Sequence, residues 1–255
     1  MIRFAVLGSG SSGNSYAFTD GVSTLLVDQG FSMVSLERRL SAVDIPLSTV
    51  KGLCVTHLHP DHVHGVSVFV KKTGLPVYMN VRAKEKEPVV FDRLRLPDSS
   101  LRLVEEEHDF TVGPFSLRCF PTSHDSGGSV GWRISIADHS LMLLTDSGIC
   151  SEEEMGEARD VEVLFLEANY DTEMLAKGPY PLALKRRIAS KWGHLSNDQA
   201  VDFLLESGFH GQRVYFIHLS DTNNNPALLA NTVESRYHGL FTVCEKGKSY
   251  QGCIA

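Results

Sequence analysis

Chemically active side chains are concentrated in one short segment, residues 55–65, which reads VTHLHPDHVHG. An apolar stretch precedes this segment and a helical pattern follows it, so it is expected to form a strand-to-helix loop. Imidazole and carboxylate groups are ligands that divalent metals accept. Residues two apart in an extended chain point to the same side, so His57 and His59 can bind one ion together. Asp61 and His62, at the turn into the helix, can point toward a neighbouring ion.

Three further ligand candidates each follow a later apolar stretch. His124 comes after the residues FPTS, Asp146 after LMLLT, and His218 after VYFI. Functional groups gather in the loops at strand ends, so these side chains are expected to converge at one edge of a sheet. A surface loop that is merely rich in histidine is the alternative for residues 55–65, and the later candidates count against it.

The hydrophobic pattern predicts a strand-rich first part and a second part in which strands and helices alternate. This order fits two packed sheets flanked by helices, although an open mixed sheet fits the pattern as well. Strands are predicted over Ile2–Leu7, Thr24–Val27, Gly52–Val55, Leu101–Val104, Phe115–Phe120, Val130–Ala137, Ser140–Thr145, Val161–Leu166 and Val214–Ile217, and helices over Ser32–Ala42, Gly65–Lys72, Ser151–Ala158, Leu182–Lys191, Ser196–Ser207 and Pro226–Arg236.

Length and composition are those of a folded enzyme, and one domain over residues 1–255 is expected. The formal net charge of −7 argues against a broad basic surface for nucleic acid, so any phosphate contact must be local. The five cysteines are scattered and odd in number, as expected of reduced thiols in the cytoplasm. Neither an export signal nor a membrane span of ~18 apolar residues is expected.

Taken in order, the motifs THLHPDH (56–62), SHD (123–125), TDSG (145–148) and HLS (218–220) resemble the successive metal motifs of the metallo-β-lactamase superfamily. The resemblance covers nearly the whole chain and implies an α/β fold, a four-layer αββα sandwich. It also implies a centre of two divalent ions, for which this donor set accepts zinc, manganese or iron. The implied ligands are His57, His59 and His124 for one ion, Asp61, His62 and His218 for the other, and Asp146 as the bridge, with His64 outside the set.

Two later motifs resemble those of phosphodiesterase and nuclease branches, including RNase Z-like enzymes. These are Glu167 in LEANY and His194 in WGHLSN. In such branches the histidine meets the scissile phosphate, and an imidazole held by a carboxylate suits protonation of a leaving oxygen near neutral pH. His194 is therefore the candidate acid and Glu167 its orienting partner. A helix N-terminus with a core carboxylate upstream is the alternative.

The glycine-rich segment GSGSSGN, residues 8–14, formally matches a dinucleotide fingerprint. A fingerprint of that kind must open a helix, whereas the residues that follow, Ser15–Val27, are predicted to form two strands around a turn. Together with GHLSN (193–197) and HLSDTNNN (218–225), the segment resembles the WalJ/YycJ-like branch, whose members are thought of as metal-dependent DNA exonucleases. A tight turn and a phosphate cradle remain equal readings of the loop, with Ser11 and Asn14 as candidate substrate contacts.

The densest basic run, ALKRRIASKW, lies directly ahead of His194. On a helix, Leu184, Ile188 and Trp192 would form the buried stripe, and Arg187 and Lys191 would lie four apart in solvent. These two cations are the candidate contacts to substrate phosphates. A solvated face with no further role is the alternative.

The motifs together predict a hydrolase that cleaves phosphodiesters with two metal ions about 3.5–4 Å apart. A DNA exonuclease is favoured, and a phosphodiesterase for a small cyclic phosphate is the alternative within the class. A β-lactamase is disfavoured by the missing leader, and a glyoxalase-II-type thioesterase by the lack of an added helical domain. A di-iron redox protein would carry Glu in place of His59, and a non-catalytic scaffold would be expected to have lost ligands. The oligomeric state is left open.

Overall fold

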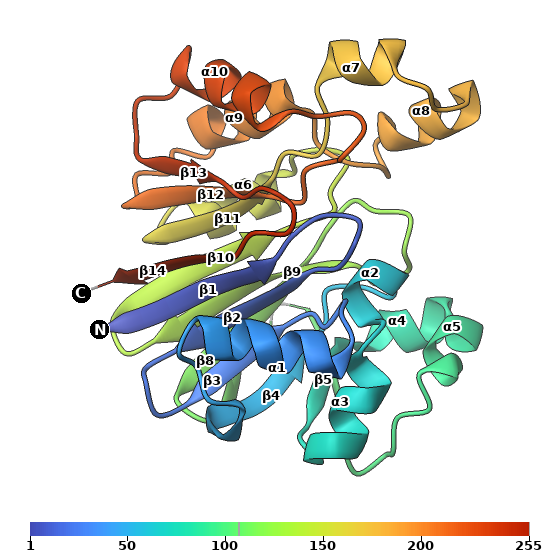
Figure 1. The fold of residues 1–255 in the computed structure, drawn as a ribbon, viewed down its shortest axis with the longest axis vertical. Coiled ribbons are helices and arrows are strands. Elements are labelled where there is room, and N and C mark those ends of the chain that lie inside the picture. Colours follow the sequence, from blue (N-terminus) through green and yellow to red (C-terminus); the bar gives the residue numbers. More distant parts are fainter. Residues whose placement is uncertain (107, 255) are drawn as a thin grey trace.

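The strands of the computed structural model, which describes residues 1–106 and 108–254, form two mixed sheets of seven strands each (Figure 1). The first sheet has the order β14-β1-β2-β3-β4-β5-β6 and comprises β1 (Ile2–Gly8), β2 (Ser15–Thr19), β3 (Thr24–Val27), β4 (Val50–Cys54), β5 (Val77–Asn80), β6 (Leu101–Val104) and β14 (Tyr250–Ile254). The second has the order β13-β12-β11-β10-β9-β8-β7 and comprises β7 (Phe110–Val112), β8 (Phe115–Pro121), β9 (Val130–Ile136), β10 (His139–Leu144), β11 (Val163–Glu167), β12 (Arg213–Ile217) and β13 (Phe241–Val243).

Helices cover the outer faces of both sheets (Figure 1). The first sheet is covered by α1 (Met33–Ala42), α2 (Pro60–Val63), α3 (Val66–Thr73), α4 (Val81–Lys86) and α5 (Pro88–Arg93). The second is covered by α6 (Glu152–Ala158), α9 (Asn197–Glu206) and α10 (Pro226–Glu234), while α7 (Thr172–Lys177) and α8 (Leu182–Ile188) project beside it. The predicted four-layer αββα sandwich is confirmed. In the described ranges, no helix is long and apolar enough to cross a bilayer.

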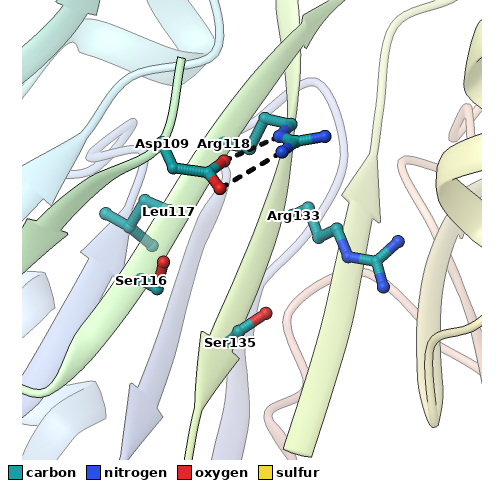
Figure 2. A pocket seen from close by; sticks show the side chains of 6 residues that line it. All are labelled: Asp109, Ser116, Leu117, Arg118, Arg133 and Ser135. Atoms are coloured by element: carbon teal, nitrogen blue, oxygen red, sulfur yellow. Dashed lines mark hydrogen bonds and ion pairs between the residues drawn. The ribbon is translucent and has the colours of Figure 1, made fainter. Parts of the chain in front are cut away.

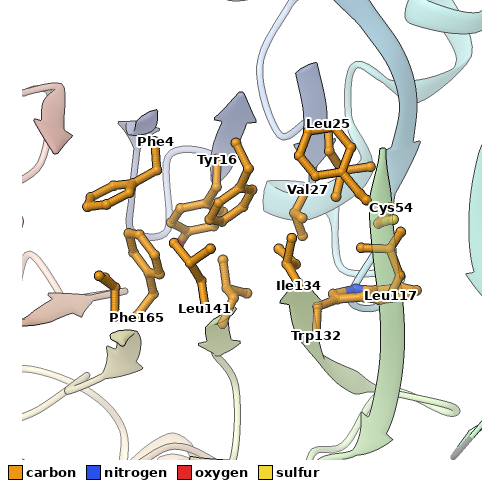
Figure 3. Close-up of a cluster of buried hydrophobic side chains, with 14 of the residues drawn as sticks. Phe4, Tyr16, Leu25, Val27, Cys54, Leu117, Trp132, Ile134, Leu141 and Phe165 are labelled. Carbon is orange, nitrogen blue, oxygen red and sulfur yellow. The ribbon is translucent and has the colours of Figure 1, made fainter. Parts of the chain in front are cut away.

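The core between the sheets follows from the alternation of side chains along each strand. In β1, Phe4 and its neighbours two residues away face the second sheet, whereas Ala5 and Leu7 face the helices. Phe4 packs edge-on against Phe165 of β11 with ring centroids 5.3 Å apart (Figure 3). Both faces of these strands are buried, which explains why their sequences read as continuous apolar runs.

The predicted helix over Leu182–Lys191 is shorter in the structure and ends at Ile188. The chain then turns, with Gly193 N donating to Ser190 O at 2.9 Å and His194 N donating to Ile188 O at 3.0 Å. The predicted burial of Trp192 is therefore wrong, since its side chain is 51% exposed. Lys191 likewise lies outside the helix and is not stacked on Arg187.

The sequence pattern also missed several short elements. These are the strands β5, β7, β13 and β14 and the helices α2, α4, α5 and α7. Each spans three to six residues, too few for a period of two or 3.6 to emerge above chance. The longer predicted elements are present, with ends that differ by a few residues.

A shallow pocket of about 320 Å³ lies over the second sheet, on β8 and β9 (Figure 2). Arg118 donates to both carboxylate oxygens of Asp109, at 2.7 and 3.1 Å. Arg133 donates to the backbone carbonyl of Glu157 at 3.0 Å. The arginines of this pocket are thus already paired within the chain, and the pocket lies away from the histidines.

Close backbone contacts between loops fix the position of the histidine-rich segment. A Cβ atom at Gly30 would overlap the carbonyl oxygen of Asp61, whereas nothing lies within 4 Å of a Cβ at Gly156, an exposed position of α6. We expect Gly30→Ala to lower the free energy of unfolding by about 1–3 kcal/mol, the usual range for overpacking. Gly156→Ala should raise it by about 0.5–1 kcal/mol, as for a helical glycine. Urea denaturation of both variants checks this, and equal stabilities would contradict it.

Candidate metal centre

The ligand candidates meet at one edge of the sandwich because the strands that precede them run in the same direction. In the first sheet, β3 and β4 are parallel, and in the second, β10, β11 and β12 are parallel. β8 also runs with β10, since both are antiparallel to β9 between them. The loops after β4, β8, β10 and β12 carry, respectively, His57 to His62, His124, Asp146 and His218.

The first cluster consists of His57, His59 and His124, whose ligand atoms lie within 4.8 Å of one another. The Nε2 atoms of His57 and His124 lie 3.0 and 3.1 Å from Nδ1 of His59. One ring nitrogen, with one hydrogen or one lone pair, cannot satisfy two such neighbours. A cation at the point where the three nitrogens meet would satisfy all of them, so this donor set fits a metal ion.

The second cluster consists of Asp61, His62 and His218. Oδ2 of Asp61 lies 3.5 Å from Nε2 of His62 and 3.4 Å from Nε2 of His218. Asp146 lies between the clusters, with Oδ2 at 3.3 Å from His62 Nε2 and Oδ1 at 3.6 Å from His124 Nε2. The structure thus brings together the residues of each predicted ligand group and places Asp146 between the two groups. His64 is exposed and lies outside these clusters.

A second set of groups fixes the ring orientation of the histidines, as is usual around metal sites. Nδ1 of His62 donates to Asp28 at 2.7 Å, and Nδ1 of His124 donates to the carbonyl of Gly193 at 2.9 Å. Nδ1 of His218 donates to Glu167 at 2.9 Å. In each ring Nε2 is thereby directed toward the cluster.

Asp28 is a functional residue that the sequence reasoning missed. It is fully buried directly after β3, and it also accepts hydrogen bonds from Thr56 N and Thr56 Oγ1, both at 2.8 Å. Thr56 Oγ1 in turn lies 3.1 Å from Nδ1 of His57. An acidic residue at the end of an apolar strand is the same signal that revealed Asp146, and it would have found Asp28.

Three residues of this edge have left-handed backbone conformations that are uncommon outside glycine. Asp28, Asp146 and His218 have φ values of 58°, 56° and 58°. Each is the first or second residue after its strand, so the backbone turns there and directs the side chain toward the centre. Such strain persists only where the surroundings enforce it, and it clusters at functional sites.

The candidate acid and its partner are in contact. Nδ1 of His194 donates to Oε1 of Glu167 at 2.7 Å, and the same oxygen accepts from His218. Oε2 of Glu167 accepts from the backbone N–H groups of Ser147, at 3.2 Å, and Leu195, at 3.1 Å. Burial raises the pKa of Glu167, but the positive charge of His194 and its hydrogen bond outweigh burial and lower it, so the carboxylate is ionised.

The two clusters differ in their protonation without metal. Burial lowers the pKa of His57 well below its usual value, and it also lowers those of His59 and His124. Burial acts in the same direction on His62, but Asp28 and Asp146 outweigh it and raise the pKa of His62 to about 10. The pKa of His218 is also raised well above its usual value, because Asp146, Asp61 and Glu167 outweigh burial. The first cluster is neutral near pH 7, whereas the second holds protons that a metal must displace.

The substrate candidates fall in different places. Ser11 and Arg187 line a cleft of about 360 Å³ over the centre, together with His194. The prediction of Asn14 as a substrate contact is corrected by the structure, because its side chain is fully buried beneath the cleft. Its Nδ2 lies 3.2 Å from Asp61 Oδ2 and 3.0 Å from His62 Nε2, so it supports the second cluster. Lys191 does not line the cleft.

Arg187 is not free in the cleft. Its Nη2 donates to Oδ1 of Asp125 at 2.9 Å, and its Nε donates to Oδ2. Oδ1 of Asp125 lies 3.6 Å from ring nitrogens of both His59 and His124. Arg187 therefore joins α8 to the first cluster through Asp125.

An αββα sandwich with adjoining histidine and aspartate clusters at its strand ends is the architecture of a metal-dependent enzyme. A family model described as the beta-lactamase superfamily domain matches residues 23–219. The chain belongs to this superfamily.

Named relatives lie within the same family. The chain is 32% identical over 223 residues to exodeoxyribonuclease WalJ of Streptococcus pneumoniae, covering 87% of this chain and 83% of that protein. It is 32% identical over 238 residues to exodeoxyribonuclease YycJ of Bacillus anthracis, covering 91% and 88%. The crystal structure of the metallo-beta-lactamase fold protein YhfI from Bacillus subtilis superposes with a TM-score of 0.75 at 19% identity, covering 98% of this chain and 99% of that one.

Asp146→Asn tests the position of Asp146 between the clusters. The variant loses one negative charge shared by both, so we expect metal content to fall at both clusters and phosphodiester hydrolysis to be abolished. The melting temperature in the presence of metal should also fall toward that of chelator-treated protein, because ion binding stabilises the native state. Elemental analysis and thermal unfolding measure these effects, with the exposed Asp98→Asn as control. Full metal content with normal turnover would refute the assignment.

The contrast in protonation predicts that the two ions leave at different pH. Metal binding at the second cluster must displace protons from His62 and His218, so its affinity falls as pH falls below their raised pKa values. The first cluster, with lowered pKa values, should keep its ion to lower pH. Metal stoichiometry after dialysis at pH values from about 8 to 5 should therefore drop in two steps. A single step would contradict this prediction.

Proposed function

We propose that this protein is a metal-dependent phosphodiesterase that degrades DNA from an end. Two divalent ions, of zinc, manganese or iron, would be held by the first cluster of His57, His59 and His124 and the second cluster of Asp61, His62 and His218, with Asp146 between them. When bound, such ions supply Lewis acidity, which activates water and neutralises charge on a phosphoryl group. The proposal includes a cytoplasmic location and one domain, and it leaves the oligomeric state open.

The observation that carries the proposal is the His194–Glu167 pair at the wall of the metal cleft. Nδ1–H of His194 donates a hydrogen bond to Glu167 at 2.7 Å. This bond keeps one proton on Nδ1, so Nε2 is the nitrogen that gains and loses a proton. In the described part of the chain, no hydrogen bond engages Nε2 of His194. A leaving alkoxide of a phosphodiester needs a proton, and an imidazolium held in this way can donate one from Nε2.

The rest of the cleft suits a phosphate chain. Ser11 is exposed at its rim, with a hydroxyl that can donate to a phosphate oxygen. Arg187 holds Asp125 with Nε and Nη2 and leaves Nη1 without a partner among the described residues. Asn169 lines the cleft and donates to the backbone carbonyl of His218 at 2.9 Å, which supports that ligand from the substrate side.

DNA is favoured as the substrate because relatives that match most of this chain are named exodeoxyribonucleases. A phosphodiesterase that acts on a small cyclic phosphate is the second candidate, and the net charge of −7 is the observation in its favour. Metal-loaded protein incubated with end-labelled single- and double-stranded DNA and RNA, beside a cyclic phosphodiester, separates these substrates. Stepwise shortening of DNA from one end is the expected result.

His194→Ala tests the acid directly. The residue lies outside the two predicted ligand clusters, so the variant should keep its metal content while DNA cleavage slows by roughly 10²–10⁴-fold, the usual effect of losing a general acid or base. Bis-p-nitrophenyl phosphate, whose leaving group needs little protonation, should be affected less. Elemental analysis and initial rates on both substrates measure this.

Two outcomes would contradict the acid role. Loss of an ion in His194→Ala would make His194 a ligand, which the grouping of Asp146, Glu167, His194 and His218 allows. Equal losses on both substrates would show that His194 does not protonate the leaving group. Tyr237→Phe, a half-buried position in the hydrophobic cluster beneath α10, provides a control variant.

A further inference from the structure

Trp192 is a large aromatic side chain that is exposed although its backbone is rigidly held. The indole ring is 51% exposed. Its neighbours are fixed, since Gly193 N donates to Ser190 O at 2.9 Å and Gly193 O accepts from the ligand candidate His124. A Cβ at Gly148 would lie 2.6 Å from Gly193 N, so the loop after β10 packs directly against this turn. The ring is therefore presented to solvent at a fixed place beside the metal centre.

Trp192 lines a groove of about 310 Å³ that adjoins the metal cleft. His124 and Asp125 form the end of the groove nearest the centre, and Thr122 to Ser129 form one side. The Arg187–Asp125 ion pair separates the two spaces, because Arg187 lines the cleft and Asp125 lines the groove. A chain that leaves the metal cleft over this pair enters the groove.

The groove is lined by two cations, Arg82 and Lys86, and two carboxylates, Glu106 and Asp125, and a third cation, Lys191, lies over the Trp192 ring. Arg82 and Lys86 line it from α4, and Nζ of Lys191 lies 5.0 Å from the centroid of the Trp192 ring. The two acids of the groove are already paired, Glu106 with Arg82 at 2.9 Å and Asp125 with Arg187. Among residues 1–106 and 108–254, no carboxylate forms an ion pair with Lys86 or Lys191. The ammonium group of Lys86 in the groove, and that of Lys191 over the Trp192 ring, can therefore turn to a phosphate.

We propose that this groove binds an unpaired nucleotide of the substrate strand, with its base stacked on Trp192 and its phosphates near Lys86 and Lys191. The inference rests on the proposed function and specifies its substrate as single-stranded DNA or a frayed end. An exposed aromatic ring next to cations is the combination that binds single strands, because every base offers a π-face to such a ring. Inside a duplex those faces are covered by neighbouring bases, so only an unpaired nucleotide or an exposed duplex end can use the ring.

Intrinsic fluorescence gives a direct test of binding. The chain has two tryptophans, and the other, Trp132, is fully buried between the sheets, so quenching by a ligand reports Trp192. A short phosphorothioate oligothymidylate should quench the metal-loaded protein. An oligomer of the same length and backbone with abasic sites should not, and a covalently closed circular duplex, which has no ends, should not. Equal quenching by the abasic oligomer would show a purely electrostatic contact and overturn the stacking proposal.

Kinetics give the second test. Base–aromatic stacking contributes about 1–3 kcal/mol, so Trp192→Ala should raise KM for single-stranded DNA by roughly 5–150-fold with a smaller change in kcat. Trp192→Phe should recover most of the loss, because phenylalanine keeps a stacking face. The increase in KM for single-stranded DNA should exceed the increase in KM for bis-p-nitrophenyl phosphate by roughly 5–150-fold. Leu240→Ala, at a position 62% exposed, is the control for removing a large exposed apolar side chain.

The outcomes separate this inference from the proposed function. If the protein degrades DNA and Trp192→Ala leaves KM unchanged, the inference fails and the proposed function stands. If no DNA is degraded but the single-stranded probe quenches Trp192 in a base-dependent way, the proposed function fails and the groove remains a single-strand site. Absence of quenching by any oligonucleotide, together with an unchanged KM, would leave Trp192 to another partner and refute the inference.

Discussion

The arrangement of the centre depends on one buried carboxylate, that of Glu167. Removal of a carboxylate from water is costly unless donors surround it, and here four donors do so. Oε1 accepts from the rings of His194 and His218, and Oε2 accepts from the backbone of Ser147 and Leu195. The last residue of β11 thus ties together the loop that carries Asp146, the loop that carries His218 and the turn that carries His194. A candidate ligand, the residue between the two clusters and the candidate acid are thus positioned by the same carboxylate.

On the side of the first sheet, Asp28 has the equivalent role, because its carboxylate accepts hydrogen bonds from both Thr56 and His62. Asp28, Asp146 and His218 all adopt left-handed backbones, a strain of order 1–3 kcal/mol at each position. Dense hydrogen bonding around them offsets this cost. Ser9 accepts from His218 N at 2.6 Å, so even the glycine-rich loop after β1 serves to hold a ligand. The loop has at least this structural use, whatever Ser11 contacts.

The fold and the ligand candidates could be predicted from the sequence because their signals are local. His57, His59 and His124 have side chains of recognisable chemistry, each following an apolar stretch, and the motifs follow in a specific order. The supporting groups could not be found in the same way. Asn14 was predicted as a substrate contact and lies buried under Asp61, because its position is set by a backbone contact between residues 47 apart in sequence. The prediction that Trp192 is buried is wrong because it extends the helical spacing of Leu184 and Ile188 to residue 192, whereas α8 ends at Ile188.

The two ends of the chain meet in the first sheet. Ile2 pairs with Ile254 and Phe4 with Gly252, so β14 covers the edge of β1. These contacts span almost the full length of the chain. Closing a loop of that size costs more conformational entropy than forming local structure, so it is expected to be slower. During synthesis β1 emerges long before β14, so its outer edge stays open until β14 has left the ribosome. An unpaired apolar strand edge is a template for association with other chains. The interval between the synthesis of β1 and that of β14 is therefore a period in which this edge is exposed to aggregation.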